Sequence, residues 1–135
     1  MKTIQTSAAP AAIGPYSQAK VIGNLLFTAG QIPLDPQTMD IVKGGIEEQT
    51  RQVLKNLDAV LAEAGASWDT VIKTTVFMTN LSDFSAFNTV YEQHLKDAKP
   101  ARSTVQVAAL PRGSVIEIEL IAEVSSRLCS KHRMS

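Results

Sequence analysis

An arginine and a glutamate stand in two stretches of the chain that otherwise have the pattern of β-strands. Arg102 stands two residues after a proline in PARSTVQV, and Glu117 lies between apolar neighbours in VIEIELIAEV. A guanidinium binds a small carboxylate through two parallel hydrogen bonds, and a nearby glutamate can orient water and transfer a proton. The pair indicates a small-anion site, although a ladder of ion pairs on a solvated strand face is the commoner role of such residues.

Side-chain alternation along the two strands decides whether these groups can meet. Arg102 and Thr104 share one face of their strand, because alternate residues point the same way. The strand that carries Glu117 follows after the short connection ALPRGS. If the two strands are neighbours, with Ala108 opposite Val115, Arg102 and Glu117 lie on the same face of the sheet. The shared face is therefore conditional on this pairing.

Two more residues are candidates for the same site. Tyr16 follows Gly14–Pro15 in a segment with neither helical nor strand periodicity, and Gly30 ends a strand. A glycine lets its backbone amide approach a ligand closely, because it has no Cβ. A loop-packing tyrosine and an ordinary turn glycine are the alternatives. The only histidines, His94 and His132, do not make an acid–base pair within one chain core.

Composition excludes several classes of function. Thirteen Lys and Arg balance thirteen Asp and Glu, so no net charge attracts the chain to nucleic acid or to an anionic membrane. The single cysteine, Cys129, rules out an internal disulfide and is typical of a reducing compartment, so we expect a cytoplasmic protein. No nucleotide-binding glycine motif, metal-spaced Cys/His cluster or long apolar segment is present. We therefore predict neither cofactor nor metal.

Periodicity predicts an α+β domain over residues 1–124, with one mixed sheet and two helices on one face. The uncovered sheet face then predicts a subunit interface. Residues 125–135 lack hydrophobic periodicity and are predicted to form a flexible tail. The expected elements are a hairpin with strands 21–22 and 25–28, a loop at 34–45, a helix from 46 to 64, a strand within 69–80, a helix at 82–96, and strands 103–108 and 115–124.

Four stretches of the chain closely resemble the YjgF family, the reactive intermediate deaminases called Rid proteins. They are AAIGPYSQA, LLFTAGQIP, IKTTVFMTNLSDFSAFNTVYEQHL and PARSTVQVAALPRGSVIEIE. The likeness runs from about Lys2 to Val124, and the segment from Pro100 to Ile118 is the family's signature. The resemblance implies a chorismate-mutase-like subunit that assembles as a homotrimer with ligand clefts between neighbouring subunits.

The resemblance also implies hydrolysis of 2-imino acids, such as 2-iminobutanoate and 2-iminopropanoate, or of their enamine tautomers. Arg102 would hold the substrate carboxylate together with the backbone amide of Gly30. Glu117 would activate water, and the Tyr16 hydroxyl and Asn88 would support the pocket. The products would be a 2-keto acid and ammonia.

Two positions depart from the pattern of many of these deaminases. Ala29 stands where many have a serine, and Thr104 stands where many have a cysteine. Both residues would still line the pocket through their backbone. Two other functions stay open at this stage. Some family members are labelled translation-inhibiting endoribonucleases, and a non-catalytic trimer that binds small carboxylates or acts as a chaperone would keep Arg102 while demanding little of Glu117.

Overall fold

The computed structural model describes residues 1–124, so the predicted tail at 125–135 lies outside the described residues. Within this range, three strands precede the first α-helix, one strand separates it from the second, and two strands follow, with short 3₁₀ turns between some of these elements. The elements are β1 (Lys2–Ile4), β2 (Ala19–Ile22), β3 (Leu25–Thr28), α1 (Ile46–Ala64), η1 (Trp68–Thr70), β4 (Val71–Met78), η2 (Leu81–Asp83), α2 (Phe84–Leu95), β5 (Ala101–Gln106), η3 (Pro111–Gly113) and β6 (Ile116–Glu123).

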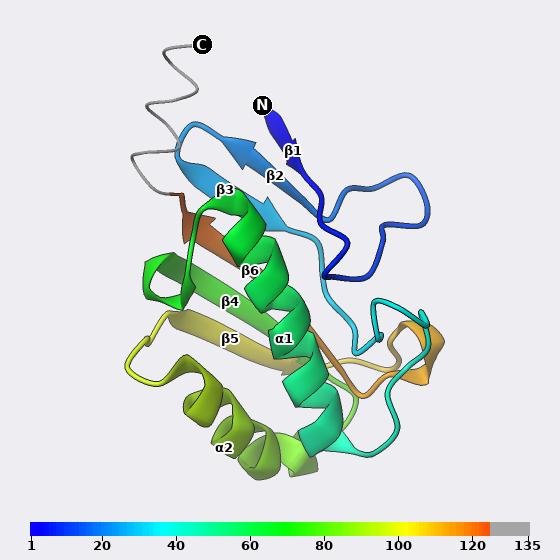
Figure 1. Cartoon of the computed structure of the whole chain (residues 1–135). Coiled ribbons are helices and arrows are strands. Elements are labelled where there is room, and N and C mark those ends of the chain that lie inside the picture. The colour runs from blue at the N-terminus through cyan, green and yellow to red at the C-terminus, as the bar shows by residue number, and fades with distance from the viewer. Residues whose placement is uncertain (125–135) are drawn as a thin grey trace.

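The six strands form one mixed sheet in the order β1-β2-β3-β6-β4-β5 (Figure 1). β4 and β5 run parallel, and α2 makes the crossover between them, as a parallel pair requires. The other neighbouring strands are antiparallel. The last strand in sequence, β6, therefore lies inside the sheet between β3 and β4.

Local signals placed the first hairpin and the first helix correctly. Ile22 and Leu25 face each other across a two-residue turn, in which Gly23 has a φ of 59°. Glycine adopts this left-handed conformation without a Cβ clash. Helix α1 ends at Gly65, whose φ of 75° is the usual left-handed stop.

Both helices cover the same face of the sheet, as the amphipathic periodicity predicts (Figure 1). The core lies between them and the sheet, and its largest fully buried side chains include Leu54, Leu57, Leu61, Met78, Phe87, Ile116 and Ile118. The opposite face carries apolar side chains that remain accessible. Among them, Phe27 and Val105 are each 42% exposed. A single chain thus leaves this sheet face, with its accessible apolar side chains, uncovered by its helices.

The predicted pairing of the Arg102 strand with the Glu117 strand is wrong. β4 lies between β5 and β6, and Val76 of β4 faces Thr104 on one side and Ile118 on the other. The reason is that β6 buries Ile116, Ile118, Leu120 and Ala122 and suits the middle of a sheet, whereas β5 has no fully buried residue and suits an edge.

This strand order changes which side chains share a face. Thr74 is opposite both Arg102 and Leu120, so Arg102 lies on the face that the helices cover. Phe77 is opposite Glu117, which therefore lies on the open face. The alternation of side chains within each strand was predicted correctly. The prediction that the two strands are neighbours, which put Arg102 and Glu117 on one face, was not. Arg102 and Glu117 of one chain are on opposite faces of the sheet.

A buried hydrogen bond joins α2 to the middle of the sheet and gives a stability test. The Tyr91 and Thr74 hydroxyls are 2.8 Å apart, and Thr74 is fully buried. We expect Tyr91→Phe to lower the free energy of unfolding by about 1–2 kcal/mol, because it leaves the Thr74 hydroxyl without that partner. Urea denaturation measures the loss. Thr89→Val removes an exposed hydroxyl from the same helix and should cost less than about 0.5 kcal/mol; equal losses would contradict this account.

Candidate functional site

A cavity of about 310 Å³ surrounds Glu117 at the end of the sheet where β3 stops. We call it the Glu117 pocket. Its walls come from the loop between β1 and β2, the end of β3, the start of the 34–45 loop and the turn before β6. The lining residues are Pro10, Ala11, Tyr16, Gln18, Ala29, Gly30, Gln31, Ile32, Leu34, Pro111 and Glu117.

A β-bulge shapes the floor of the Glu117 pocket. Phe27 is opposite Ile121, and Gln31 is bridged to Ile118, so four steps on one strand (27 to 31) match three on the other (121 to 118). The extra residue lies in the segment that contains Ala29 and Gly30. A bulge redirects nearby side chains and is common beside active sites. Here it turns this segment toward Glu117.

Gly30 leaves room for the Glu117 carboxylate. A Cβ at position 30 would come within 2.7 Å of the Glu117 Cδ and within 2.9 Å of its Cγ. The backbone amides of Ala29 and Gln31 donate to Gln18 and Ile118, but that of Gly30 has no hydrogen-bond acceptor within residues 1–124. The pocket thus presents a carboxylate and an available N–H side by side.

Gln18 holds the loop that carries Tyr16. Its side chain is buried, and its amide nitrogen donates to the carbonyl oxygens of Thr6, Ala9 and Pro10, at 3.0, 3.4 and 2.8 Å. Its amide oxygen accepts a hydrogen bond from the Thr6 N–H at 2.7 Å. These bonds satisfy backbone groups of a loop that has no regular structure of its own. Strand or helix periodicity does not reveal this role, so sequence analysis missed Gln18.

Arg112 joins two other loops that reach the Glu117 pocket. It donates a hydrogen bond to the Met39 carbonyl oxygen at 3.1 Å and lies 3.7 Å from an Asp40 carboxylate oxygen. The 34–45 loop and the η3 turn consequently lie side by side (Figure 1). Arg112 thus holds the 34–45 loop beside the Glu117 pocket, and loops of this length are often functional.

The surroundings of Glu117 favour its protonated form. Partial burial raises the pKa of Glu117 above the ordinary value of 4.5, and the negative charge of Glu119 on the same sheet face adds to the increase. A carboxylate with a raised pKa is a stronger base than an ordinary glutamate. In its ionised form, Glu117 is thus suited to accept a proton from water.

A second cavity, of about 560 Å³, lies between α2 and the start of β5 and contains Arg102. We call it the Arg102 pocket. The Arg102 guanidinium carbon lies 5.4, 5.7 and 4.9 Å from the ring centres of Phe84, Phe87 and Tyr91. Distances of this order allow cation–π attraction. Burial raises the pKa of Tyr91, so its hydroxyl stays neutral beside the guanidinium.

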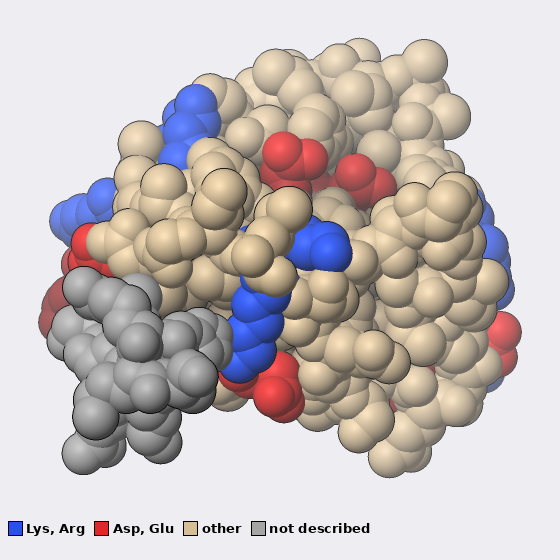
Figure 2. All heavy atoms as spheres, turned by 90° about the horizontal axis from the view of Figure 1, so that it is seen from above, with Lys and Arg blue, Asp and Glu red and all other residues tan. Residues whose placement is uncertain are grey.

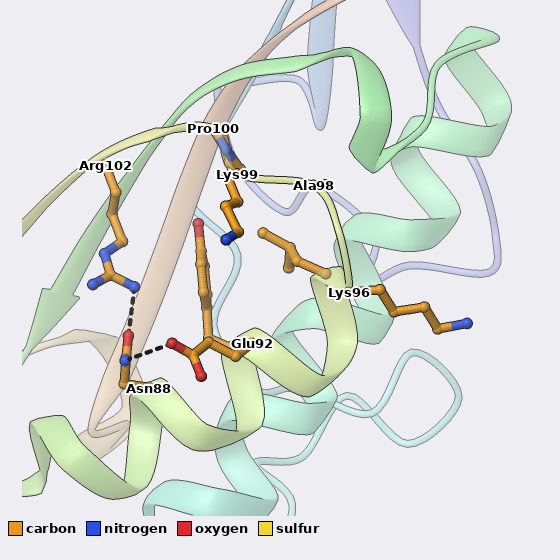
Figure 3. Close-up of a pocket in the computed structure, with 9 residues that line it drawn as sticks. Asn88, Glu92, Lys96, Ala98, Lys99, Pro100 and Arg102 are labelled. Carbon is orange, nitrogen blue, oxygen red and sulfur yellow. Dashed lines mark hydrogen bonds between the residues drawn. The ribbon is translucent and has the colours of Figure 1, made fainter.

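Asn88 orients the guanidinium from the side of the helix (Figure 3). Arg102 Nη1 donates to Asn88 Oδ1 at 2.8 Å, and Asn88 Nδ2 donates to Glu92 Oε1 at 3.3 Å. This contact uses one of the five N–H groups of the arginine. The Tyr91 hydroxyl is a second hydrogen-bond partner of the guanidinium, and the remaining N–H groups of Arg102 are available to an anion.

The predicted site residues fall into two groups. Tyr16, Ala29, Gly30 and Glu117 all line the Glu117 pocket. Arg102 and Asn88 line the Arg102 pocket. Thr104 follows Arg102 on the same strand face but lines neither cavity. The structure brings together the members of each group, and it places the two groups on opposite faces of one sheet.

Other kinds of site are not evident in the described part of the chain. Within residues 1–124, no group of three or more His, Cys, Asp or Glu side chains is arranged to hold a metal ion. No helix in that range is long and apolar enough to cross a membrane. Figure 2 shows Lys and Arg in small separate groups with Asp and Glu among them. This view therefore lacks the continuous basic surface that nucleic-acid binding commonly uses.

Comparison with known proteins identifies the family. The model of the family described as Endoribonuclease L-PSP matches residues 6–124. The chain belongs to this family. A RutC family protein of Synechocystis is 54% identical over 124 residues, which cover 90% of this chain and 95% of the relative. The human protein named 2-iminobutanoate/2-iminopropanoate deaminase is 46% identical over 121 residues, covering 90% of this chain and 88% of the human one.

Solved structures of this L-PSP family share the fold described above. A conserved Rid family protein of Yersinia pestis has a TM-score of 0.89 and 52% identity, covering 91% of this chain and 98% of its own. E. coli TdcF, solved with bound serine, has a TM-score of 0.88 and 45% identity, covering 93% and 100%. These matches confirm the α+β subunit with a mixed sheet and two helices.

Titration of Glu117 tests the electrostatics of its pocket in this L-PSP family protein. Carboxyl carbon NMR should give Glu117 a midpoint above 4.5, since burial and Glu119 both disfavour the ionised form. Glu119→Gln should lower that midpoint, because it removes the neighbouring negative charge. Glu63→Gln, an exposed change on α1, is the control and should leave the midpoint in place. A midpoint at or below 4.5 in the wild type would contradict the assignment.

Proposed function

We propose that the protein hydrolyses small 2-imino acids or their enamine tautomers to 2-keto acids and ammonia, at sites formed between copies of the chain in a homotrimer. The observation that carries this proposal is the separation of Arg102 from Glu117. In one chain they lie on opposite faces of the sheet and line different cavities. A substrate held by Arg102 therefore needs Glu117 from another copy.

The uncovered sheet face supports association of copies. Phe27 and Val105 are each 42% exposed, and Ile22 is 57% exposed on the same face. Burying such apolar area is the main favourable term in most protein association. Closed symmetric assembly would bury the same patch in every copy and repeat the same composite site.

The available groups suit imine hydrolysis. Arg102 has free donors for the substrate carboxylate, which fixes the position of the neighbouring imine carbon. The water oxygen attacks this carbon of the protonated imine while Glu117 accepts one water proton, and the C=N electron pair moves to nitrogen to give a neutral carbinolamine. Glu117 returns that proton to the nitrogen, the C–N bond breaks, and the hydroxyl group of the carbinolamine gives its remaining proton to water as the C=O bond forms. Ammonia and the 2-keto acid are released.

The other predicted groups would assist these steps. The free Gly30 N–H can donate to the substrate carboxylate, and the Tyr16 hydroxyl can donate to the substrate or to water from its exposed position at the pocket rim. Asn88 keeps Arg102 in place. Every step uses side chains and backbone of this chain and a water molecule.

Named relatives support this class of substrate. The human and mouse proteins that are 46% and 47% identical carry the name 2-iminobutanoate/2-iminopropanoate deaminase. The TdcF structure contains serine, a small amino acid with a carboxylate. The description of the family model as an endoribonuclease favours a second candidate activity. If the protein is a ribonuclease, it should cleave RNA in a manner that depends on Arg102. If it is a deaminase, it should consume imine in the absence of RNA.

Mixing two inactive variants tests whether the site is shared between copies. Arg102→Met keeps the packing volume but removes the guanidinium, and Glu117→Gln removes the base. Each variant alone should lose at least about 100-fold in activity. Reassembly of an equal mixture should restore about one quarter of the wild-type sites, because each such site needs one intact residue from each variant.

The assay couples the protein to a threonine dehydratase and traps the surviving imine with semicarbazide. Arg102→Met mixed with wild type in the same way is the matched control, and it should show about half of the wild-type activity, because every site has Glu117 and half of the sites have Arg102. No recovery in the mixture of the two variants would show that both groups act within one chain. Absence of any wild-type effect on trapped imine would reject deamination itself.

Gly30→Ala tests the close approach of backbone and carboxylate. The new methyl group would occupy the space of the Glu117 side chain and displace it. We expect activity to fall by about 10-fold or more with little loss of thermal stability, since a half-exposed side chain can move aside. Gly45→Ala is the control, because a Cβ there meets nothing within 4 Å. Wild-type activity in Gly30→Ala would refute the role given to this approach.

A further inference from the structure

The Arg102 pocket contains a second cation that the chemistry described so far does not use. Lys99 lines the same cavity and precedes Arg102 by three residues. Figure 3 shows both side chains extending from this stretch of chain toward α2, whereas Lys96 extends away from them. Within residues 1–124, the ammonium group of Lys99 has no ion pair or hydrogen bond. An unpaired ammonium thus shares a cavity with the guanidinium.

The charges in this pocket are not balanced. Three cationic side chains, Arg102, Lys99 and Lys96, line it with a single acid, Glu92. The Glu92 carboxylate accepts the Asn88 amide, which in turn holds Arg102, so this acid faces the helix side of the cavity. A small anion held by Arg102 leaves the positive charge of Lys99 uncompensated. A second negative group on the same ligand would compensate it.

Geometry allows one small ligand to meet both cations. Lys99 lies before β5 begins at Ala101, so the alternation of strand residues between two faces does not govern it, and its side chain lines the cavity together with that of Arg102. Three residues of chain separate the two Cα atoms by at most about 10 Å, and lysine and arginine side chains are long and flexible enough to converge across that distance. The cavity of about 560 Å³ is larger than a monocarboxylic three- or four-carbon acid requires. Its apolar walls, from Leu95, Ala98 and Pro100, can contact the methylene groups between two carboxylates.

We propose that Lys99 is a specificity-determining residue that favours 2-imino acids bearing a second carboxylate on the side chain. Arg102 binds the carboxylate next to the imine carbon, and Lys99 binds the distal one. This inference rests on the proposed function, because it takes Arg102 as the clamp for the first carboxylate. It adds a substrate class: imines of acidic amino acids, with the corresponding dicarboxylic 2-keto acids as products.

Binding of stable keto acids tests the proposal without the labile imine. Calorimetric titrations at low ionic strength would compare 2-oxobutanoate, with one carboxylate, and 2-oxoglutarate, with two. We expect the wild type to bind 2-oxoglutarate about fivefold more tightly, the size of effect that a partly exposed charge pair gives. Lys99→Gln should remove this preference and leave the affinity for 2-oxobutanoate unchanged. Added salt should also reduce the preference.

Two further variants separate the outcomes. Lys55→Gln removes an exposed lysine from α1 and should retain the fivefold preference. Arg102→Met should weaken both acids. Equal affinities of the wild type for the two acids, or an unchanged preference in Lys99→Gln, would overturn the role of Lys99 alone. If Arg102→Met binds both acids as tightly as the wild type, the proposed carboxylate clamp fails, and the function proposed above fails with it.

Discussion

The position of β6 in the middle of the sheet is the constraint on which the rest of the site depends. Its inward residues Ile116, Ile118 and Leu120 are buried against the helices, so the alternate residues must face outward. Glu117 is one of these. Moving Glu117 to the helix side would require a one-residue slip, which would expose the three core residues. The packing of the core therefore determines where the carboxylate points.

The same strand order places β4 between the two chemical groups. Arg102 lies on the edge strand and reaches the aromatic face of α2, while Glu117 reaches the bulge at Gly30. Each group is well supported by its own surroundings. The topology thus places the two groups on different faces, and under the proposed function an assembly of copies would bring them together.

Local signals in the sequence were enough for most of the fold. The glycines at 23 and 65, the periodicity of the helices and the strand alternation each correspond to a feature of the structure. The strands that pair with β6 could not be predicted from these signals. Strand pairing depends on contacts between residues far apart in the sequence, which local alternation does not encode. The predicted α+β domain therefore holds, while the predicted shared face of Arg102 and Glu117 does not.

The aromatic contacts of Arg102 affect how it can bind a ligand. Three rings and Asn88 surround the guanidinium, so much of the rotational freedom of this long side chain is already lost in the folded protein. A ligand that docks there need not order the arginine itself, which leaves more of the interaction energy as affinity. Lysine would carry the same charge but has no planar group to fit among the rings. At position 102, the shape of the cation therefore matters as much as its charge.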